Sequence, residues 1–512
     1  MTTTANELSM RRRAVVAVTL LAVLTVGLAM LTMTRESQAA VEGTPWPNKQ
    51  PEGQGSAWVD PATAGHPWGE AVSGILTFRG NPTRNYYGQG PVPTNPVVRW
   101  SYPESPMCSE SSVEQGDHSG TFNWCGSGWT GQPSVFERDG RTWVVFGAYD
   151  KAVHFLDADT GEQIIPSFPT GDIIKGSVTV DPDGFPLVYS GSRDNYFHIL
   201  AIDGDEPREL WSFDANSVDG LWNDDWDGSA LVIDDYLFEG GENSLWFIWK
   251  LNRSYDDEGL VTVDPTLVFM APGWDEELLE AVGDENVSIE NSVAISGDVI
   301  YFGNSGGLIQ GWDISGVKHG RDPERVFRFW AGDDTDASVV IDEEGFLYVV
   351  SEVKRHTERS AEIGQILKLD PRQNDDPIVW SLADPDNKGI WATPAIYRDL
   401  LIVPTDGGRI MAVDRNTGTL RWEFFMRGPT WQSPVVVDDV LIQGDCRGGV
   451  LSGFDLTDTT KAPPKLWSVP LGGCVESTPA VWDGQIFVGT RGGHFFAIGE
   501  NRGTGIMAPG GN

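Results

Sequence analysis

The chain has 512 residues, 40% of them hydrophobic, so it is long enough to bury a large core, and its 60 glycines and 32 prolines are typical of a turn-rich all-β protein. The formal net charge of −38 disfavours binding to nucleic acid or anionic lipid, because both carry the same sign of charge. It favours cations or basic partners, or solubility in a salty medium.

The N-terminus predicts export. Arg11–Arg13 precede Ala14–Met33, an uncharged stretch long enough to span a bilayer as a helix, and the basic flank favours a cytoplasmic N-terminus. Ser37–Ala39 resembles a cleavage signal, so residues 1–39 are either a transmembrane signal anchor or a removed signal peptide. We therefore expect a cell-membrane protein with one N-terminal helix and an extracytoplasmic body, or a secreted protein if the chain is cut near Ala39.

Composition divides the rest of the chain. Residues 40–75 are rich in Pro, Gly and Ala and predict a tether. Residues 76–502 predict one folded domain, and residues 503–512 predict a flexible tail. One domain spans this length because a single repeated unit accounts for nearly all of it.

This unit recurs eight times and predicts four strands in each copy. Its clearest copies are "TPAIYRDLLIVPTDGGRIMAVDRNTGTLRWEF" from Thr393 and "TPAVWDGQIFVGTRGGHFFAIG" from Thr478. Apolar residues alternate with a period of two on both sides of a turn such as Asp-Gly, which predicts a hairpin, and a third and a fourth run follow. The first strands begin at Gln132, Ser177, Ser229, Ser292, Ser338, Thr393, Ser433 and Thr478.

Eight such units predict an all-β fold, an eight-bladed β-propeller of four-stranded antiparallel blades. The last unit stops near Gly499, after its third strand. We expect Val97–Tyr102, which precedes the first unit, to supply the missing outer strand. A ring closed by an N-terminal strand leaves no open sheet edge between its first and last blades.

The four cysteines predict disulfides, as is typical of an extracytoplasmic protein. We expect the pairs Cys108–Cys125 and Cys446–Cys474, although four cysteines allow three pairings. The first pair lies in the segment before the first blade, and the second joins loops of neighbouring blades at one face of the ring. A metal site built from these cysteines is disfavoured, because no C-x-x-C motif occurs and the chain has seven scattered histidines.

The repeat also predicts which side chains surround the central channel. Residues two positions before each first strand should lie at one mouth of the ring, where ligand sites form in such folds. Carboxylate and amide oxygens suit a Ca²⁺-like ion, ionisable groups can transfer protons, and indole rings offer stacking faces. The candidate metal ligands are Asp227, Glu290 and Asn291; the candidate catalytic residues are Asp336 and Lys175; the candidate cofactor-binding residues are Trp391 and Trp431.

Each of these candidates also has a structural interpretation. In so acidic a chain, carboxylates reach the channel mouth by composition alone, and repeat tryptophans dock blades together. The segment Asn223–Gly228, "NDDWDG", matches the first half of a calcium-binding loop, but a predicted strand follows where a helix is required. The alternatives at this segment are a strand-flanked cation site and an acidic turn.

The units from Thr393 and Thr478, together with the lead-in Thr77–Trp100, resemble the pyrroloquinoline-quinone (PQQ) type of propeller repeat. The resemblance implies one of two classes. Quinoprotein alcohol dehydrogenases hold PQQ with a calcium or lanthanide ion, whereas binding-only members, such as the propeller lipoprotein of the outer-membrane assembly complex, act as scaffolds. The dehydrogenases typically carry adjacent cysteines beside the cofactor, and this chain has no adjacent cysteines.

The sequence therefore favours a membrane-tethered, extracytoplasmic binding or scaffold module of the cell envelope rather than an enzyme. Its partner would be a cell-envelope protein or a small ligand, and not a nucleic acid. The alternative is a quinoprotein-type oxidoreductase with its site on the propeller axis. Ca²⁺ is a possible ligand, and the missing cysteine pair makes PQQ doubtful.

Overall fold

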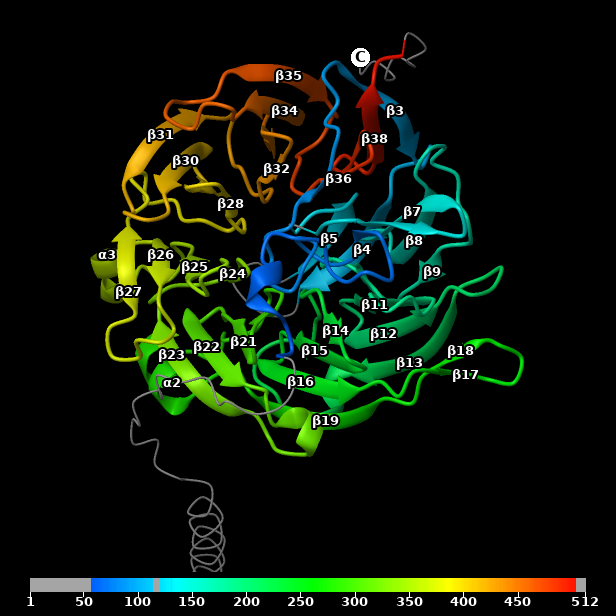
Figure 1. The fold of residues 1–512 in the computed structure, drawn as a ribbon, viewed down its shortest axis with the longest axis horizontal. Coiled ribbons are helices and arrows are strands. Elements are labelled where there is room, and N and C mark those ends of the chain that lie inside the picture. The colour runs from blue at the N-terminus through cyan, green and yellow to red at the C-terminus, as the bar shows by residue number, and fades with distance from the viewer. Residues whose placement is uncertain (1–56, 114–119, 130, 503–512) are drawn as a thin grey trace, which may run out of the picture. The chain divides into compact units, whose positions relative to one another are not determined.

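The structure, a computed structural model, describes residues 57–113, 120–129 and 131–502. The predicted membrane segment Ala14–Met33 and the predicted tail 503–512 lie outside these residues. Within the described ranges no helix has both the length and the apolar character needed to cross a membrane. The described strands form eight blades arranged in a ring (Figure 1), which confirms the predicted propeller.

The first four blades follow one another along the chain, and the inner strand of each comes first. Blade 1 contains β1 (Gly74–Ile75), β6 (Ser134–Arg138), β7 (Arg141–Ala148), β8 (Ala152–Asp157) and β9 (Phe168–Pro169). Blade 2 contains β10 (Thr179–Val180), β11 (Leu187–Gly191), β12 (Tyr196–Ala201) and β13 (Arg208–Asp214). Blade 3 contains β14 (Leu231–Ile233), β15 (Tyr236–Gly240), β16 (Leu245–Lys250) and β19 (Thr266–Pro272). Blade 4 contains β20 (Ala294–Ser296), β21 (Val299–Phe302), β22 (Leu308–Asp313) and β23 (Glu324–Trp330).

The last four blades repeat this order. Blade 5 contains β24 (Val340–Ile341), β25 (Leu347–Val350), β26 (Ile366–Leu369) and β27 (Ile378–Leu382). Blade 6 contains β28 (Ala395–Tyr397), β29 (Leu400–Pro404), β30 (Arg409–Asp414) and β31 (Leu420–Phe425). Blade 7 contains β32 (Val435–Val437), β33 (Val440–Gly444), β34 (Val450–Asp455) and β35 (Lys465–Pro470). Blade 8 contains β36 (Ala480–Trp482), β37 (Gln485–Gly489), β38 (Phe495–Glu500), β2 (Gly88–Gln89) and β3 (Pro96–Tyr102).

Blade 8 is built from both ends of the described chain. Strand β3 pairs antiparallel with β38, so that Val98 lies opposite Ile498 in the outermost position. Strand β2 pairs in parallel with β36 on the inner side. The N-terminal segment of the described chain, residues 57–102, therefore completes the outer edge of the last blade and also lines its inner edge.

Tryptophans of the outer strands dock three of the blades onto the next. In three blades the indole N–H donates to a backbone carbonyl of the following blade: Trp100 to Ala158, Trp380 to Arg415 and Trp422 to Thr459, at 2.8, 3.0 and 3.1 Å. Gly418, at φ 72°, lies beneath Trp380, and a Cβ there would be 2.7 Å from Trp380 Cγ. The glycine of the repeated Thr-Gly pair, which has no side chain, thus leaves room for the tryptophan of the preceding blade to pack against the backbone.

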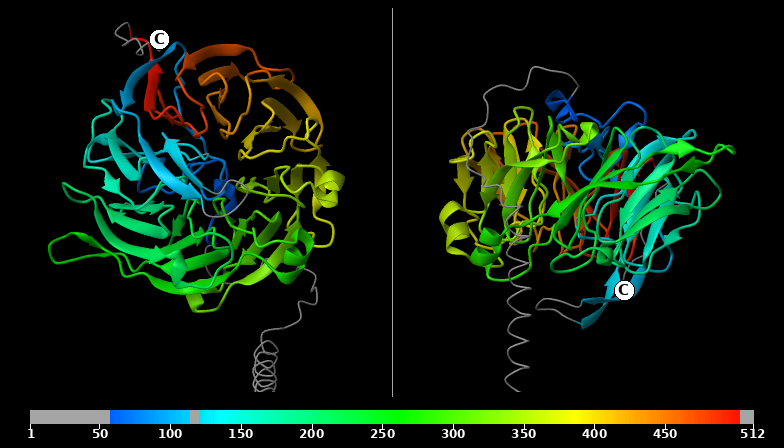
Figure 2. Two further views of the ribbon diagram at one scale, coloured as in Figure 1. Left: turned by 180° about the vertical axis from the view of Figure 1, so that it is seen from behind. Right: turned by 90° about the horizontal axis from the view of Figure 1, so that it is seen from below.

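Elements outside the blades lie on both faces and on the rim. A hairpin of β4 (Cys108–Val113) and β5 (Gly120–Cys125) and the N-terminal segment lie on opposite faces of the ring (Figure 2). A second hairpin, β17 (Ser254–Tyr255) and β18 (Val261–Thr262), projects from the rim of the ring. The helices α2 (Glu276–Val282) and α3 (Glu358–Ile363) lie at other places on the rim. Short 3₁₀ turns occur at Pro61–Thr63, Ala215–Ser217 and Val317–His319.

Both predicted disulfides are present, Cys108–Cys125 and Cys446–Cys474. The first joins the two strands of the β4–β5 hairpin at its base. The second joins the loop after β33 to the segment before β36. Each therefore fixes a loop at the face of the ring where the candidate site lies.

The packed part of the chain begins earlier than residue 76. Trp58 is 6% exposed and donates its indole N–H to Ile314 O, while Val59 pairs with Gly297 of blade 4. Trp68 is also buried. Composition predicts a tether over 40–75 because Pro and Gly dominate it, but its isolated large aromatic residues bury enough apolar surface to hold the last part against the ring.

Residues of the N-terminal segment also fill one end of the central channel. Arg84 is fully buried and donates to the carbonyls of Val293 at 2.8 Å and of Ser229 at 2.8 Å. Arg79 is fully buried as well and donates to the carbonyls of Pro394 and Pro434 at 2.6 and 2.5 Å. The channel is therefore closed on this side, and only the opposite mouth opens toward the candidate site.

Candidate functional site

A small cavity lies on the ring axis beyond this closure. Its floor is Phe78 of the N-terminal segment, and its walls come from consecutive blades. Five of the seven residues predicted for the site line it: Asp227, Glu290, Asn291, Asp336 and Trp391. The volume open to a water-sized molecule is about 20 Å³, which is room for an ordered water or a small ion.

Lys175 lies beside the cavity in a cluster of carboxylates. Its ammonium is 2.6 Å from Asp227, 2.6 Å from Glu242 and 3.4 Å from Asp225, and Arg193 pairs with Asp225 at 2.8 Å. Burial by itself would lower the pKa of Lys175, but the three carboxylates raise it well above its ordinary value. The lysine is therefore held as an ammonium ion and cannot accept a proton.

The carboxyl groups around Lys175 titrate differently from one another. Burial raises the pKa of Asp225 to about 7 and raises the pKa of Asp227 well above its ordinary range. Burial opposes ionisation of Glu242, but the adjacent ammonium and hydrogen bonds from Asp227, Lys175 and Asn223 together outweigh it and lower the pKa of that carboxyl. The cluster thus holds protons near neutral pH, because its carboxylates outnumber its cations.

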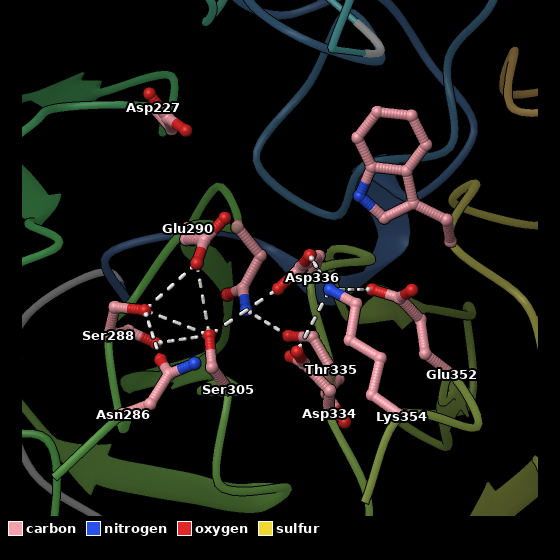
Figure 3. A network of polar contacts seen from close by, with 12 residues as sticks. Asp227, Asn286, Ser288, Glu290, Ser305, Asp334, Thr335, Asp336, Glu352 and Lys354 are labelled. Atoms are coloured by element: carbon pink, nitrogen blue, oxygen red, sulfur yellow. Dashed lines mark hydrogen bonds and ion pairs between the residues drawn. The ribbon is translucent and has the colours of Figure 1, made fainter. Parts of the chain in front are cut away.

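Lys354 occupies a second carboxylate cluster (Figure 3). Its ammonium lies 2.8 Å from Glu352, 3.0 Å from Asp334 and 3.4 Å from Asp336. The stem of the lysine is half exposed, whereas the three carboxylates are buried. Burial opposes ionisation of Asp336, but Lys354 outweighs it and lowers its pKa, while burial and Asp336 raise the pKa of Asp334 to about 8.

Glu290 lies between the two clusters. Its Oε1 accepts hydrogen bonds from Ser288 at 2.9 Å and from Ser305 at 3.2 Å, and it forms no ion pair with any described residue (Figure 3). Burial, followed by repulsion from Asp336, raises the pKa of Glu290 well above its ordinary value. Protonation of this cavity-facing carboxyl is therefore favoured relative to an exposed glutamate.

Two carboxylate triads have a spacing that could hold a metal ion. Ligand atoms lie within 4.8 Å of one another in each, and the triads are Asp227, Glu242 and Glu290, and Asp334, Asp336 and Glu352. A lysine ammonium already contacts members of each triad. The third predicted ligand, Asn291, is used by the fold, since its Nδ2 donates to Thr335 O at 2.9 Å and its Oδ1 accepts from Gly303 N at 3.2 Å.

Indole rings cross the mouth of the cavity at right angles. Trp391 lies 4.9 Å from Trp129 at 85° and 5.8 Å from Trp431 at 83°, measured between ring centroids. Lys175 sits 4.7 Å over the ring of Trp129. These edge-to-face contacts leave no pair of parallel faces between which a planar cofactor could stack.

The sequence analysis did not single out several residues of the site. Glu242 and Glu352 follow the second strands of their blades, and Lys354 lies in the loop beyond β25, where no periodic signal exists. Trp129 adjoins Thr130, a predicted channel residue that lies outside the described residues. As the sequence predicts, a strand, β14, and not a helix follows Asn223–Gly228, so this segment is not a helix–loop–helix calcium loop.

Comparison with known proteins agrees with the repeat. Residues 362–498 match the sequence family described as outer membrane protein assembly factor BamB. Over these residues the chain is similar to a PQQ-like propeller repeat. The match covers the repeats whose pattern is clearest in the sequence, and no curated protein sequence matches the chain.

Solved structures share the propeller fold of this chain at low sequence identity. A quinohemoprotein alcohol dehydrogenase from Pseudomonas putida is 12% identical with a TM-score of 0.57, over 88% of this chain and 82% of that one. The corresponding enzyme from Comamonas testosteroni is 14% identical with a TM-score of 0.54, over 86% and 82%. A europium-containing methanol dehydrogenase is 13% identical with a TM-score of 0.55, over 84% and 98%. These similarities establish the fold alone.

Proposed function

We propose that this PQQ-like propeller is an extracytoplasmic binding module, tethered to the membrane by its N-terminal segment, that docks a cell-envelope protein or a small ligand. The observation that carries this proposal is the size of the axial cavity, about 20 Å³ for a water-sized molecule. Such a site accepts water or an ion and excludes a fused tricyclic quinone. The matching family, described as an outer membrane protein assembly factor, points to the same scaffold role.

The residues at the axis do not fit PQQ. The rings of Trp391 and Trp129 are perpendicular and give no stacking slot. Lys175 and Lys354 already neutralise part of both carboxylate triads. PQQ itself carries carboxylates, and the ammonium groups of Lys175 and Lys354, which could pair with them, are already in contact with acidic side chains.

A quinoprotein-type oxidoreductase is the second candidate, and one observation favours it. Asp227, Glu290 and Asp336, which come from three consecutive blades, face one cavity. In such an enzyme Asp227 and Glu290 would be metal ligands and Asp336 would be the base, with a pKa that Lys354 keeps low against the opposing effect of burial. Trp391 would be the platform beside them.

One experiment separates the two candidates. The full-length protein is incubated with PQQ and Ca²⁺, and bound quinone is measured by absorbance after gel filtration, together with dye reduction by primary alcohols. We expect neither bound quinone nor alcohol-dependent dye reduction, and we expect crosslinking in native membranes to recover a cell-envelope protein with the propeller. Stoichiometric quinone binding with dye reduction that Asp336→Asn abolishes would instead establish the oxidoreductase.

A further inference from the structure

A second and larger cavity lies away from the axis, where the ring closes. Its volume open to a water-sized molecule is about 500 Å³, which is in the range of small-molecule sites. The N-terminal stretch Pro91–Thr94 and β3 form one wall, and the β36–β37 turn with the end of β38 forms another. Thr142 and Asp159 of blade 1 complete it, so both ends of the folded chain contribute.

Two arginines line this cavity without a carboxylate partner. The stem of Arg99 lies over Gly499, where a Cβ would be 3.1 Å from Arg99 Cγ, and its guanidinium makes one long contact, 3.5 Å to Glu500 O. Arg502 lies at the end of β38 and is exposed. Neither arginine forms an ion pair with another described residue, although acidic residues outnumber basic ones by 74 to 36 in this chain.

Most of the carboxylates that line the cavity are engaged elsewhere. Glu500 Oε2 accepts hydrogen bonds from the backbone N–H groups of Thr94 at 2.7 Å and Asn95 at 3.2 Å. Asp159 accepts from Gln485 Nε2 at 3.2 Å. Asp483, in the turn between β36 and β37, is the one carboxylate lining the cavity for which the described residues provide no such donor.

The inner part of the cavity is apolar and rigid. Trp482, Phe487 and Val92 line it and are buried at 6%, 0% and 8% exposure. Trp482 is fixed in place because its indole N–H donates to Glu137 Oε1 of blade 1 at 2.9 Å. The cavity therefore combines a flat apolar floor with two guanidinium groups whose hydrogen-bonding capacity is largely unused.

We propose that this cavity binds an anionic ligand that bears a carboxylate on a flat apolar body. Arg99 and Arg502 bind the carboxylate, a planar partner that matches the guanidinium fork, and the apolar body lies against Trp482 and Val92. This site is independent of the axial cavity and of the proposed function. Because residues of blade 1, blade 8 and the N-terminal segment all contact the ligand, binding also stabilises the closed ring.

Naphthalene-2-carboxylate is the probe, and its uncharged amide is the matched control. Titration calorimetry and thermal unfolding of the full-length protein should show that the carboxylate binds and raises Tm, whereas the amide binds far more weakly. Arg99→Gln should weaken binding about tenfold or more, because a charge-assisted pair is lost. Asp483→Asn should strengthen it, because one of the three like charges that line the cavity is removed.

Controls keep these outcomes separate from misfolding. Arg321→Gln removes another exposed arginine that forms no ion pair with a described residue, but one far along the chain in blade 4, and should leave binding unchanged. Arg502→Gln repeats the test at an exposed position where folding is not at risk. Equal affinity for carboxylate and amide, no Tm shift, or unchanged binding in both Arg99→Gln and Arg502→Gln would overturn the proposal.

Discussion

The ammonium of Lys175 lies 2.6 Å from Asp227 Oδ2, and both side chains are almost completely buried, at 6% and 1% exposure. Residues of blades 2 and 3 are thereby joined at the axis by an ammonium–carboxyl contact from which water is excluded. Such a contact is costly to break, since Lys175 alone would be an uncompensated buried charge.

Lys175→Met should destabilise the protein by about 3–5 kcal/mol, because it leaves three buried carboxyl groups without their ammonium partner. Urea unfolding at neutral pH measures the loss. The deficit should shrink at acidic pH, where the carboxyl groups become protonated. Lys250→Met, at an exposed lysine of β16, is the matched control and should change stability little; an equal effect in the two variants would contradict the role of the cluster.

Lys354→Met should convert the second carboxylate triad into a calcium site. The ligand atoms of Asp334, Asp336 and Glu352 lie within 4.8 Å of one another, and the ammonium that neutralises them is gone in the variant. We expect Ca²⁺ to raise Tm in the variant but not in the parent protein. At a Ca²⁺ concentration one hundred times Kd, the variant should gain about 2.7 kcal/mol in its free energy of unfolding. Adding Glu352→Gln to the variant should abolish the shift, and a calcium response that survives this second change would refute the assignment.

Glu239 should make the protein less stable as pH rises. This carboxyl is fully buried on β15, and burial raises its pKa from 4.5 to about 8 despite the nearby Arg84. Between these two values the folded state binds more protons than the unfolded state, so stability is complete below about pH 4.5 and falls by about 1.4 kcal/mol per pH unit up to about pH 8.

Glu239→Gln removes this titration and should flatten the pH dependence, so that the variant is more stable than the parent protein at pH 8. Urea unfolding at a series of pH values provides the measurement. Glu258→Gln, at an exposed position between β17 and β18, should leave the slope unchanged. A slope that Glu239→Gln does not reduce would mean that other buried carboxyl groups dominate.

Gly418→Ala should destabilise the protein more than Gly345→Ala does. Both glycines have positive φ, 72° and 81°, so both substitutions incur the same backbone strain. At Gly345 a Cβ meets nothing within 4 Å, whereas at Gly418 it meets Trp380 Cγ at 2.7 Å. The difference between the two free energies of unfolding, about 1–3 kcal/mol, measures the loss of tryptophan docking; no difference would show that the room left by the glycine is not needed.

The repeat predicts the blades well because alternation, hairpin turns and docking tryptophans are local signals. Trp422 and Gly418, for example, occupy the same unit and are recognisable in isolation. The register also predicts that Asp227, Glu290 and Asp336 share one mouth of the channel, and these three residues do line one cavity. Their chemical roles stay predictions.

The parts that sequence reasoning missed depend on segments without periodicity. Lys354 reaches its triad from a loop, and Trp129 reaches the axis from the segment that follows the β4–β5 hairpin. Arg79 and Arg84 fill the channel and donate hydrogen bonds to backbone carbonyls. Because every residue has such a carbonyl, these acceptors cannot be recognised from the sequence. Charge and spacing also do not show that the side-chain amide of Asn291 is hydrogen-bonded to neighbouring backbone groups.

The pairing of β3 with β38 sets the order in which the molecule can assemble. Val98 is synthesised about four hundred residues before its partner Ile498, so strand β3 stays unpaired until blade 8 itself has emerged. Contacts between residues so distant in sequence form slowly, and until they form the unpaired strand can pair incorrectly with another chain. Biogenesis of this propeller is therefore limited by the meeting of its two ends, and truncation at either end should yield an open, aggregation-prone ring rather than a smaller folded one.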